Sequence, residues 1–177
     1  MFKYKMVINA FVLPAMMLLI SCGQSADNKN NSKENSPAEK TETTVPGIEK
    51  LDFTDSILLK ANDNMRFDKE LFRIRAGKKI NLIFKNTGAK SAASMTHNVV
   101  ILKSGVDIAD FADIAHNAKT EQYVPSSLDS LIIAHTRLVG GGDSDQVEFI
   151  IPKPGIYDFI CSFPGHWGTM QGKIVAQ

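Results

Sequence analysis

Three side chains with metal-binding chemistry lie close together near the C-terminus. Cys161 is followed by His166 after four residues and by Met170 after three more. A thiolate, an imidazole and a thioether form a soft to borderline donor set, which suits copper far better than magnesium or calcium. A second imidazole would complete a trigonal site with a weak axial methionine. His97, within the run Met95-Thr96-His97-Asn98, is the obvious candidate.

Each of these residues also has a simpler interpretation when it is taken alone. An unpaired cysteine often fills space in a core, a methionine fills gaps there, and a histidine can lie at the surface. Strand alternation, however, turns Cys161 inward, and Pro164-Gly165 permits a sharp bend that returns His166 and Met170 to the sulfur. His97 precedes a strand-like run, so a neighbouring strand could bring it opposite the loop, although spacing alone cannot show this pairing.

The elements that must position these residues are predominantly short strands. Apolar and β-branched runs separated by turn-formers predict seven strands at residues 56–59, 71–75, 79–85, 98–102, 147–151, 156–161 and 173–176. Short strands separated by turn-forming residues in this way predict an all-β sandwich. Helical periodicity over 107–119, with Asp107 as the N-cap, predicts one short helical insertion.

The N-terminus has the pattern of an export signal. Lys3 and Lys5 precede an apolar run that is too short to be trusted as a membrane span, which predicts a signal peptide over residues 1–21. The run Leu19-Ile20-Ser21-Cys22 resembles a bacterial lipobox, so we expect Cys22 to be lipidated and to anchor the chain to a membrane. The alternative is an ordinary cleaved signal peptide with a chance cysteine, and both interpretations place the protein in the periplasm or cell envelope.

Residues 22–47 are almost wholly polar, which predicts a disordered tether because such a segment cannot bury enough apolar surface to fold. Residues 48–177 have the length of one domain with one core. The chain contains two cysteines. Assigning Cys22 to lipid and Cys161 to metal leaves none for a disulfide.

Other classes of function have little support in the sequence. A net charge of +1, from 20 basic and 19 acidic side chains, argues against nucleic acid as a partner. No catalytic triad, phosphate-binding loop or pair of catalytic carboxylates stands out, so we expect no enzyme activity. His116 has only Asp113 as a ligand-type residue at helical spacing and is expected to be solvated, and His135 is expected to be a surface or packing residue.

With the loop and the upstream histidine in place, the domain resembles the cupredoxins and specifically the azurins. The spacing of four and then three residues in the loop is the azurin pattern. Residues 62–67, Met95-Thr96-His97-Asn98 and residues 133–140 are also similar to azurin segments, and the resemblance covers most of 59–175. It implies a Greek-key β-sandwich or barrel that holds one type 1 blue copper ion.

The resemblance also implies roles for individual residues. Three equatorial copper ligands and one weak axial ligand are expected at His97, Cys161, His166 and Met170. The carbonyl of Thr96 would make a distant fifth contact, although azurins have glycine there and a β-branched side chain needs more room. Asn98 would tie the two ligand loops together, and the backbone N–H of Phe163 would donate to the cysteine sulfur.

Two further departures from azurins concern the core. The azurin disulfide is missing, and the tryptophan that usually follows His-Asn is Val99. An apolar patch for docking redox partners is expected around the edge of His166, formed by Met65, Met95, Phe163, Pro164, Gly165 and Trp167. For Trp167 an alternative is that the ring packs against the domain.

The expected function is one-electron shuttling between periplasmic or membrane-bound redox proteins, such as a cytochrome, an oxidase or a reductase, through weak transient contacts. The alternative is a copper-binding module that delivers metal to a periplasmic oxidase or reductase. A dinuclear copper centre would need a second cysteine in the loop, and residues 162–165 contain none.

Overall fold

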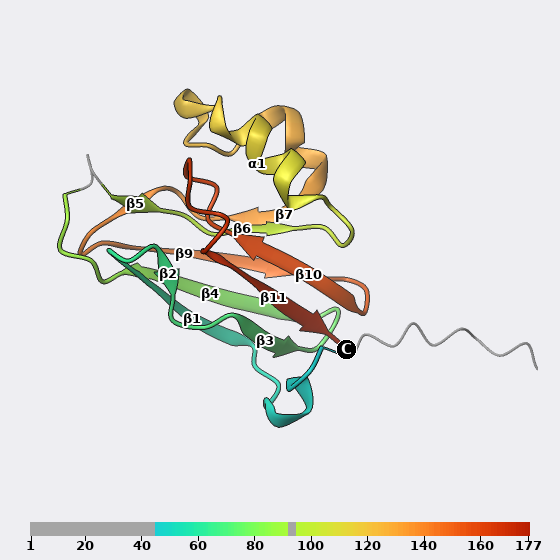
Figure 1. Ribbon diagram of the computed structural model, residues 1–177. Coiled ribbons are helices and arrows are strands. Elements are labelled where there is room, and N and C mark those ends of the chain that lie inside the picture. Colours follow the sequence, from blue (N-terminus) through green and yellow to red (C-terminus); the bar gives the residue numbers. More distant parts are fainter. Residues whose placement is uncertain (1–44, 92–94) are drawn as a thin grey trace, which may run out of the picture. The chain divides into compact units, whose positions relative to one another are not determined.

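Two β-sheets form the body of the domain in the computed structural model, which describes residues 45–91 and 95–177 (Figure 1). The first sheet has the strand order β2 (Arg66–Phe67), β1 (Ser56–Asn62), β4 (Lys79–Asn86) and β9 (Ser144–Ile150). The second has the order β3 (Leu71–Ile74), β11 (Gln171–Ala176), β10 (Gly155–Ile160), β6 (Val100–Leu102) and β7 (Ile132–His135). Two short strands, β5 (Thr96–His97) and β8 (Val139–Gly140), pair separately.

The main core lies between the two sheets and is built by strand alternation. In β1 every second residue is buried, and β4 follows the same pattern. Phe159 from the second sheet lies 5.5 Å from the ring of Phe67 and 5.8 Å from that of Phe72. Cys161 and Met170 belong to this same buried cluster, so the ligand loop begins and ends in the core.

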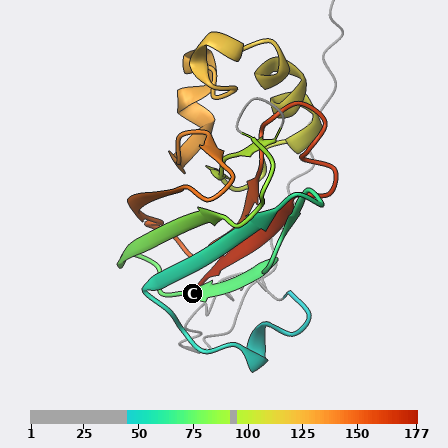
Figure 2. The same ribbon diagram turned by 90° about the vertical axis from the view of Figure 1, so that its left-hand side faces the viewer.

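A helical segment covers one side of the sandwich (Figure 2). It comprises α1 (Ile108–His116) and the 3₁₀ helices η2 (Lys119–Glu121) and η3 (Ser126–Leu131). The carboxylate of Asp107 accepts hydrogen bonds from the N–H groups of Ala109 and Asp110, which confirms the predicted N-cap. A second apolar cluster joins Phe111 and Ala115 of α1 to the second sheet.

The predicted all-β class with one short helix is confirmed, and each of the seven predicted strands is present with shifted ends. Asn98 and Val99 lie outside β6, so the prediction of a strand from residue 98 was wrong by two residues. The strands β2, β5, β7 and β8 were not predicted. β2, β5 and β8 have only two residues each, which is too short for an alternating pattern of apolar and polar residues to be recognised.

The predicted signal peptide at 1–21, the lipidation site Cys22 and residues 22–44 of the predicted tether lie outside the described residues. The described part of the chain has a short 3₁₀ helix, η1 (Ile48–Lys50), before β1. Within the described ranges no helix is long and apolar enough to cross a membrane.

The sheet topology defines two opposite ends of the domain. β1 and β4 are parallel neighbours, paired from Ser56 and Asn81 to Ala61 and Asn86. Both strands therefore begin at one end of the domain and finish at the other. The end where they finish carries Asn62 and is the end at which the predicted ligands meet.

Candidate metal centre

Three donor atoms converge in the interior at one end of the domain. His97 Nδ1 lies 4.0 Å from Cys161 Sγ, and His166 Nδ1 lies 3.7 Å from the same sulfur. The two Nδ1 atoms are 3.2 Å apart. All three residues are buried, and together they form a group that could hold a metal ion.

The spacing of these atoms fits one ion. A point equidistant from the three donors lies about 2.1 Å from each, within the usual range of about 2.0–2.3 Å for a metal bound to imidazole nitrogen and thiolate sulfur. Two imidazoles and one thiolate are the equatorial set of blue-copper sites. The residues present therefore fit a copper ion.

Strand pairing brings the distant histidine to the loop. β10 pairs with β6 through Ile160 opposite Val100, so Cys161 follows β10 beside the segment that carries His97. β5 is held in turn by β8, with His97 opposite Val139. The pairing that spacing could not establish is thus provided by the second sheet and the small β5–β8 ladder.

The loop from Cys161 to Met170 is closed by its own backbone hydrogen bonds. The N–H of Cys161 donates to the carbonyl of Met170 at 2.9 Å, and the N–H of Met170 donates to the carbonyl of His166 at 2.9 Å. Gly165 has a φ of 80°, a conformation that favours glycine. The sharp bend expected at Pro164-Gly165 therefore returns His166 to the sulfur.

Asn98 links the two ligand-bearing segments through a pair of buried hydrogen bonds. Its Nδ2 donates to Ser162 Oγ at 2.8 Å, and its Oδ1 accepts from the Ser162 N–H at 2.9 Å. Both residues are almost fully buried. The role of Ser162 was not predicted, because a serine beside a ligand has no distinctive sequence signal.

A backbone carbonyl orients the first histidine. His97 Nε2 lies 3.2 Å from the carbonyl oxygen of Asn62 at the end of β1. When Nε2 carries the proton and donates to this carbonyl, the lone pair of Nδ1 is left facing Cys161 and His166. Sequence reasoning missed this contact, because any residue at position 62 would supply the same carbonyl.

The protonation states of the cluster follow from its burial. Desolvation by burial, together with a smaller effect of the nearby His97, lowers the pKa of His166 to about 4. Burial also lowers the pKa of His97, against opposing effects of the Asn62 carbonyl and the Asp63 charge. Both imidazoles are therefore neutral near pH 7 and available as ligands.

The cysteine sulfur is held by two backbone donors. Burial raises the pKa of the Cys161 thiol to about 12, while hydrogen bonds from the backbone N–H groups of Asn98 and Phe163 favour the thiolate. The Phe163 donor was expected from the family resemblance, and the Asn98 donor was not. A bound metal cation would deprotonate this thiol outright, because coordination favours the thiolate far more strongly than these two donors do.

The two expected axial groups lie beside the cluster. Met170 is fully buried in the core that contains Cys161. Thr96 is buried on β5 directly opposite Gly140 on β8. Because Gly140 has no side chain, the pairing gives the β-branched Thr96 the room that was in question.

The residues of the predicted docking patch are only partly accessible. Met65, Met95, Phe163, Pro164 and Trp167 are half-buried, and Gly165 is exposed. The ring of Phe163 lies 4.7 Å from that of His166 and 5.1 Å from that of Tyr123. Trp167 packs against the second apolar cluster, as the alternative interpretation expected, so part of its ring is not available to a partner.

The other two histidines lie outside the cluster. His116 ends α1 and is exposed. His135 at the end of β7 is also exposed, and its Nδ1 lies 3.2 Å from the carbonyl of Thr136. Neither has ligand geometry in the described part of the chain.

Comparisons with known proteins agree with this geometry. Residues 54–177 match the family described as copper binding proteins, plastocyanin/azurin family. Azurin from Alcaligenes faecalis is 36% identical over 122 residues, which cover 67% of this chain and 94% of that protein. Outer membrane protein H.8 from Neisseria gonorrhoeae is 37% identical over 119 residues, and the match spans 66% of this chain but only 64% of that protein.

Solved structures show the same fold. Reduced auracyanin from the photosynthetic bacterium Roseiflexus castenholzii has a TM-score of 0.65 and 32% identity, covering 71% of this chain and 99% of that one. Auracyanin A from Chloroflexus aurantiacus, described as a "blue" copper protein, has a TM-score of 0.62 and 31% identity, covering 69% of this chain and 98% of that one. With its buried cluster of two histidines and a cysteine, this chain belongs to the plastocyanin/azurin family of copper-binding proteins.

Proposed function

We propose that the protein is an exported type 1 blue copper protein that shuttles single electrons between redox proteins of the cell envelope. The observation that carries this proposal is the buried cluster of His97, Cys161 and His166, in which every donor atom already faces the other two. A bound copper ion would supply a one-electron couple between Cu(I) and Cu(II). The chain itself supplies the ligands and holds them.

The surrounding hydrogen bonds keep the ligands in place whatever the charge of the centre. Asn62 fixes the ring of His97, Asn98 fixes the start of the loop, and the backbone N–H groups at residues 98 and 163 contact the sulfur. Because these groups belong to paired strands and a closed loop, little rearrangement accompanies a change of oxidation state. Small rearrangement favours fast electron exchange.

We assign the weak axial position to the thioether of Met170 and a more distant contact to the carbonyl of Thr96. The burial of Met170 beside Cys161, and the location of Thr96 directly before His97, support these assignments. Both groups would tune the reduction potential and contribute little to holding the ion.

Electrons would enter and leave at the edge of His166. No hydrogen bond ties Nε2 of this ring to another group within the described ranges, and the half-buried Phe163 and Pro164 lie beside it in the loop. An apolar patch of this kind suits the small, weak contacts of electron-transfer partners, such as a cytochrome, an oxidase or a reductase. Burial of all three ligands favours retention of copper over its delivery to another protein.

We also propose attachment to a membrane through a lipid on Cys22, with a polar tether before the domain. The lipobox-like run and the similarity to a protein named outer membrane protein H.8 support this location. The test is incorporation of a labelled fatty acid by the full chain in a bacterial host. Loss of the label in a Cys22→Ser variant would support the assignment, and an unlabelled wild-type chain would refute it.

The copper function is tested by adding Cu(II) to the purified chain. We expect an intense blue thiolate-to-copper absorption that disappears reversibly on one-electron reduction, and a Cys161→Ser variant should be colourless. His135→Gln is the matched control for His97→Gln and His166→Gln, because His135 is exposed and lies outside the cluster. A colourless wild-type protein, or a blue His166→Gln variant with an unchanged spectrum, would refute the proposal.

A further inference from the structure

A half-buried carboxylate lies beside the metal centre and has no part in the function proposed above. Asp63 directly follows β1, and the carbonyl oxygen of the residue before it, Asn62, lies 3.2 Å from His97 Nε2. Standard bond lengths place the Cα of Asp63 about 3 Å from that oxygen. The carboxylate therefore lies on the order of 10 Å from the ion that the cluster would hold.

One oxygen of this carboxylate is hydrogen-bonded and the other is not. Asp63 Oδ2 accepts the N–H groups of Ala89 at 2.8 Å and Lys90 at 3.3 Å. Oδ1 is buried and has no hydrogen-bond partner among the residues that the structure describes. No lysine or arginine among them forms an ion pair with Asp63. A buried carboxylate oxygen without a partner costs stability, and a role in redox chemistry is one explanation for keeping it.

Close packing of the neighbouring backbone shields the free oxygen from water. A Cβ at Gly88 would collide with Asp63 Oδ1 and would lie 3.0 Å from Asn86 Oδ1, so two acceptor oxygens converge on this glycine. The N–H of Gly88 donates to Asn86 Oδ1 at 3.0 Å, which leaves Asp63 Oδ1 without a donor. The same segment packs on Gly141, where a Cβ would lie 2.6 Å from the carbonyl oxygen of Lys90. The charge of Asp63 is therefore screened less than that of an exposed carboxylate.

We propose that the negative charge of Asp63 stabilises Cu(II) over Cu(I) in this centre and so lowers its reduction potential. A fixed anion near the ion favours the state with the greater positive charge, and the one electron that distinguishes the two states comes from the redox partner. The same charge acts on the protein without metal. Burial lowers the pKa of His97, while the Asn62 carbonyl and the charge of Asp63 raise it. The inference rests on the copper function proposed above.

The size of the effect follows from the distance between the carboxylate and the ion. At about 10 Å and an effective dielectric constant of about 20–40, one charge changes the ratio of oxidised to reduced centre by about four- to fifteenfold. We expect about fivefold, near the lower end, because Asp63 is only half-buried and solvent screens part of its charge. A fivefold change corresponds to about 40 mV, since tenfold is about 59 mV for a one-electron couple.

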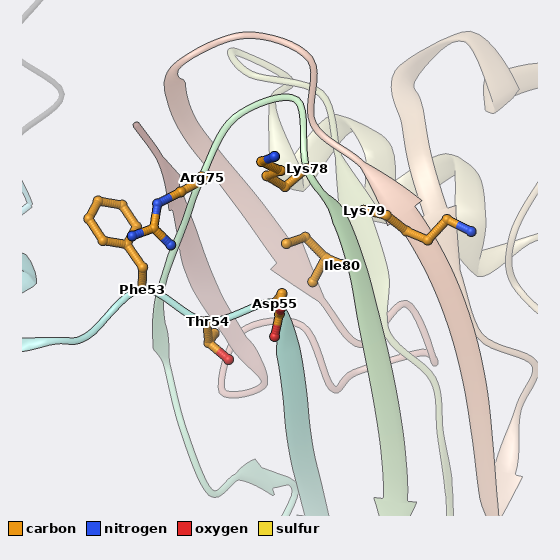
Figure 3. Close-up of a pocket in the computed structure, with 7 residues that line it drawn as sticks. All are labelled: Phe53, Thr54, Asp55, Arg75, Lys78, Lys79 and Ile80. Carbon is orange, nitrogen blue, oxygen red and sulfur yellow. The ribbon is translucent and has the colours of Figure 1, made fainter.

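The first test is a redox titration of the copper-loaded chain and its variants. Asp63→Asn removes the charge but keeps an oxygen that can accept the N–H groups of Ala89 and Lys90. We expect its reduction potential to rise by about 40 mV, the fivefold shift. Asp55→Asn is the matched control, because Asp55 is exposed, precedes β1 and lines a cavity at the other end of that strand (Figure 3). About 25 Å of strand separates the two aspartates, so this variant should keep the wild-type potential.

Asp63→Glu separates the charge from the structure around it. Its extra methylene must enter the space that Gly88 limits, so this variant disturbs the loop more than Asp63→Asn does, yet it keeps the charge. The ratio of oxidised to reduced centre should therefore stay within about twofold of the wild type. The proposal is overturned by an Asp63→Glu variant shifted as far as Asp63→Asn, by an Asp63→Asn variant with the wild-type potential, or by an equal shift in Asp55→Asn.

The metal affinities of the apoprotein give a readout that needs no electron transfer. Because the Cys161 thiol loses its proton on binding, the site gains one unit of charge with Zn(II) and none with Cu(I). Asp63→Asn should therefore weaken Zn(II) binding by about fivefold and leave Cu(I) binding unchanged, as measured by competition with chelators. Equal weakening of both ions would indicate a purely structural role for Asp63 and would overturn the proposal.

The same samples test the copper function separately. A blue wild-type chain whose potential does not change in Asp63→Asn refutes only the role of Asp63. A colourless wild-type chain refutes the copper function. A loss of Zn(II) affinity in Asp63→Asn, with Cu(I) affinity unchanged, would still support the action of this charge on a divalent ion in that case.

Discussion

Replacing Asn98 by alanine is expected to destabilise the apoprotein by about 2–4 kcal/mol. The change removes both hydrogen bonds to Ser162, at 2.8 and 2.9 Å, in a region that is almost fully buried. The Ser162 N–H would be left without an acceptor, which costs about 1–3 kcal/mol, and loss of the second bond costs about 1 kcal/mol more. For a domain of this size the midpoint of thermal unfolding should fall by about 10 °C.

Ser162→Ala is the matched control, because it removes the hydroxyl but leaves the Ser162 N–H bonded to Asn98 Oδ1. Asn98 Nδ2 keeps the Gln122 carbonyl, at 3.5 Å, as its remaining acceptor, so the change should cost about 1–2 kcal/mol. Urea unfolding of the wild type, both single variants and the double variant gives the coupling energy, which we expect to be about 1 kcal/mol or more. Additive effects, or an Asn98→Ala variant no less stable than Ser162→Ala, would refute the view that this pair locks the ligand segments together.

Three further outcomes are expected. Binding of Cu(II) at pH 7 should release about one proton, measured in weakly buffered solution. The proton comes from the thiol of Cys161, whose pKa burial raises to about 12, and not from His166, whose pKa is lowered to about 4 so that the ring is already neutral. Release of two or more protons would contradict these pKa values. The apoprotein should lose stability as the pH falls from 6.5 towards 4, since the unfolded chain then protonates His166 while the folded protein does not, and His166→Gln should flatten this part of the pH profile. Asp107→Ala should cost about 1 kcal/mol in urea unfolding with the copper spectrum unchanged, and an altered spectrum would show that the helix cap reaches the metal centre.

The ligand loop could be predicted from sequence because its information is local. Strand alternation fixes the direction of Cys161, and the turn that Gly165 permits limits where His166 can return. His97 was different, because its approach depends on the register of β6 against β10. Local patterns predict that a strand exists but do not identify its neighbour. Ligand chemistry therefore made His97 a candidate, and only the family resemblance placed it in the site.

The packing of Trp167 could not be settled from sequence for a similar reason. Its neighbours are the side chains of the second apolar cluster, which come from α1, η3 and the second sheet. Those elements are distant in sequence, so local patterns do not show which of them the ring contacts. The packing of the helical segment therefore determines how much of the Trp167 ring stays accessible to a partner.

The parts of the metal centre that escaped prediction are largely made by the backbone, and this explains why the centre tolerates sequence change. The Asn62 carbonyl orients His97, and the Asn98 N–H contacts the sulfur beside the expected Phe163 N–H, so none of these contacts depends on a side chain. These backbone contacts require the strand positions to be kept and place no demand on the side chains at residues 62 and 163. Thr96 is a case in which a side chain differs from azurins while the strand position is kept. The glycine of azurins is replaced, yet its strand partner in this chain is Gly140, so the ladder and the direction of His97 are preserved.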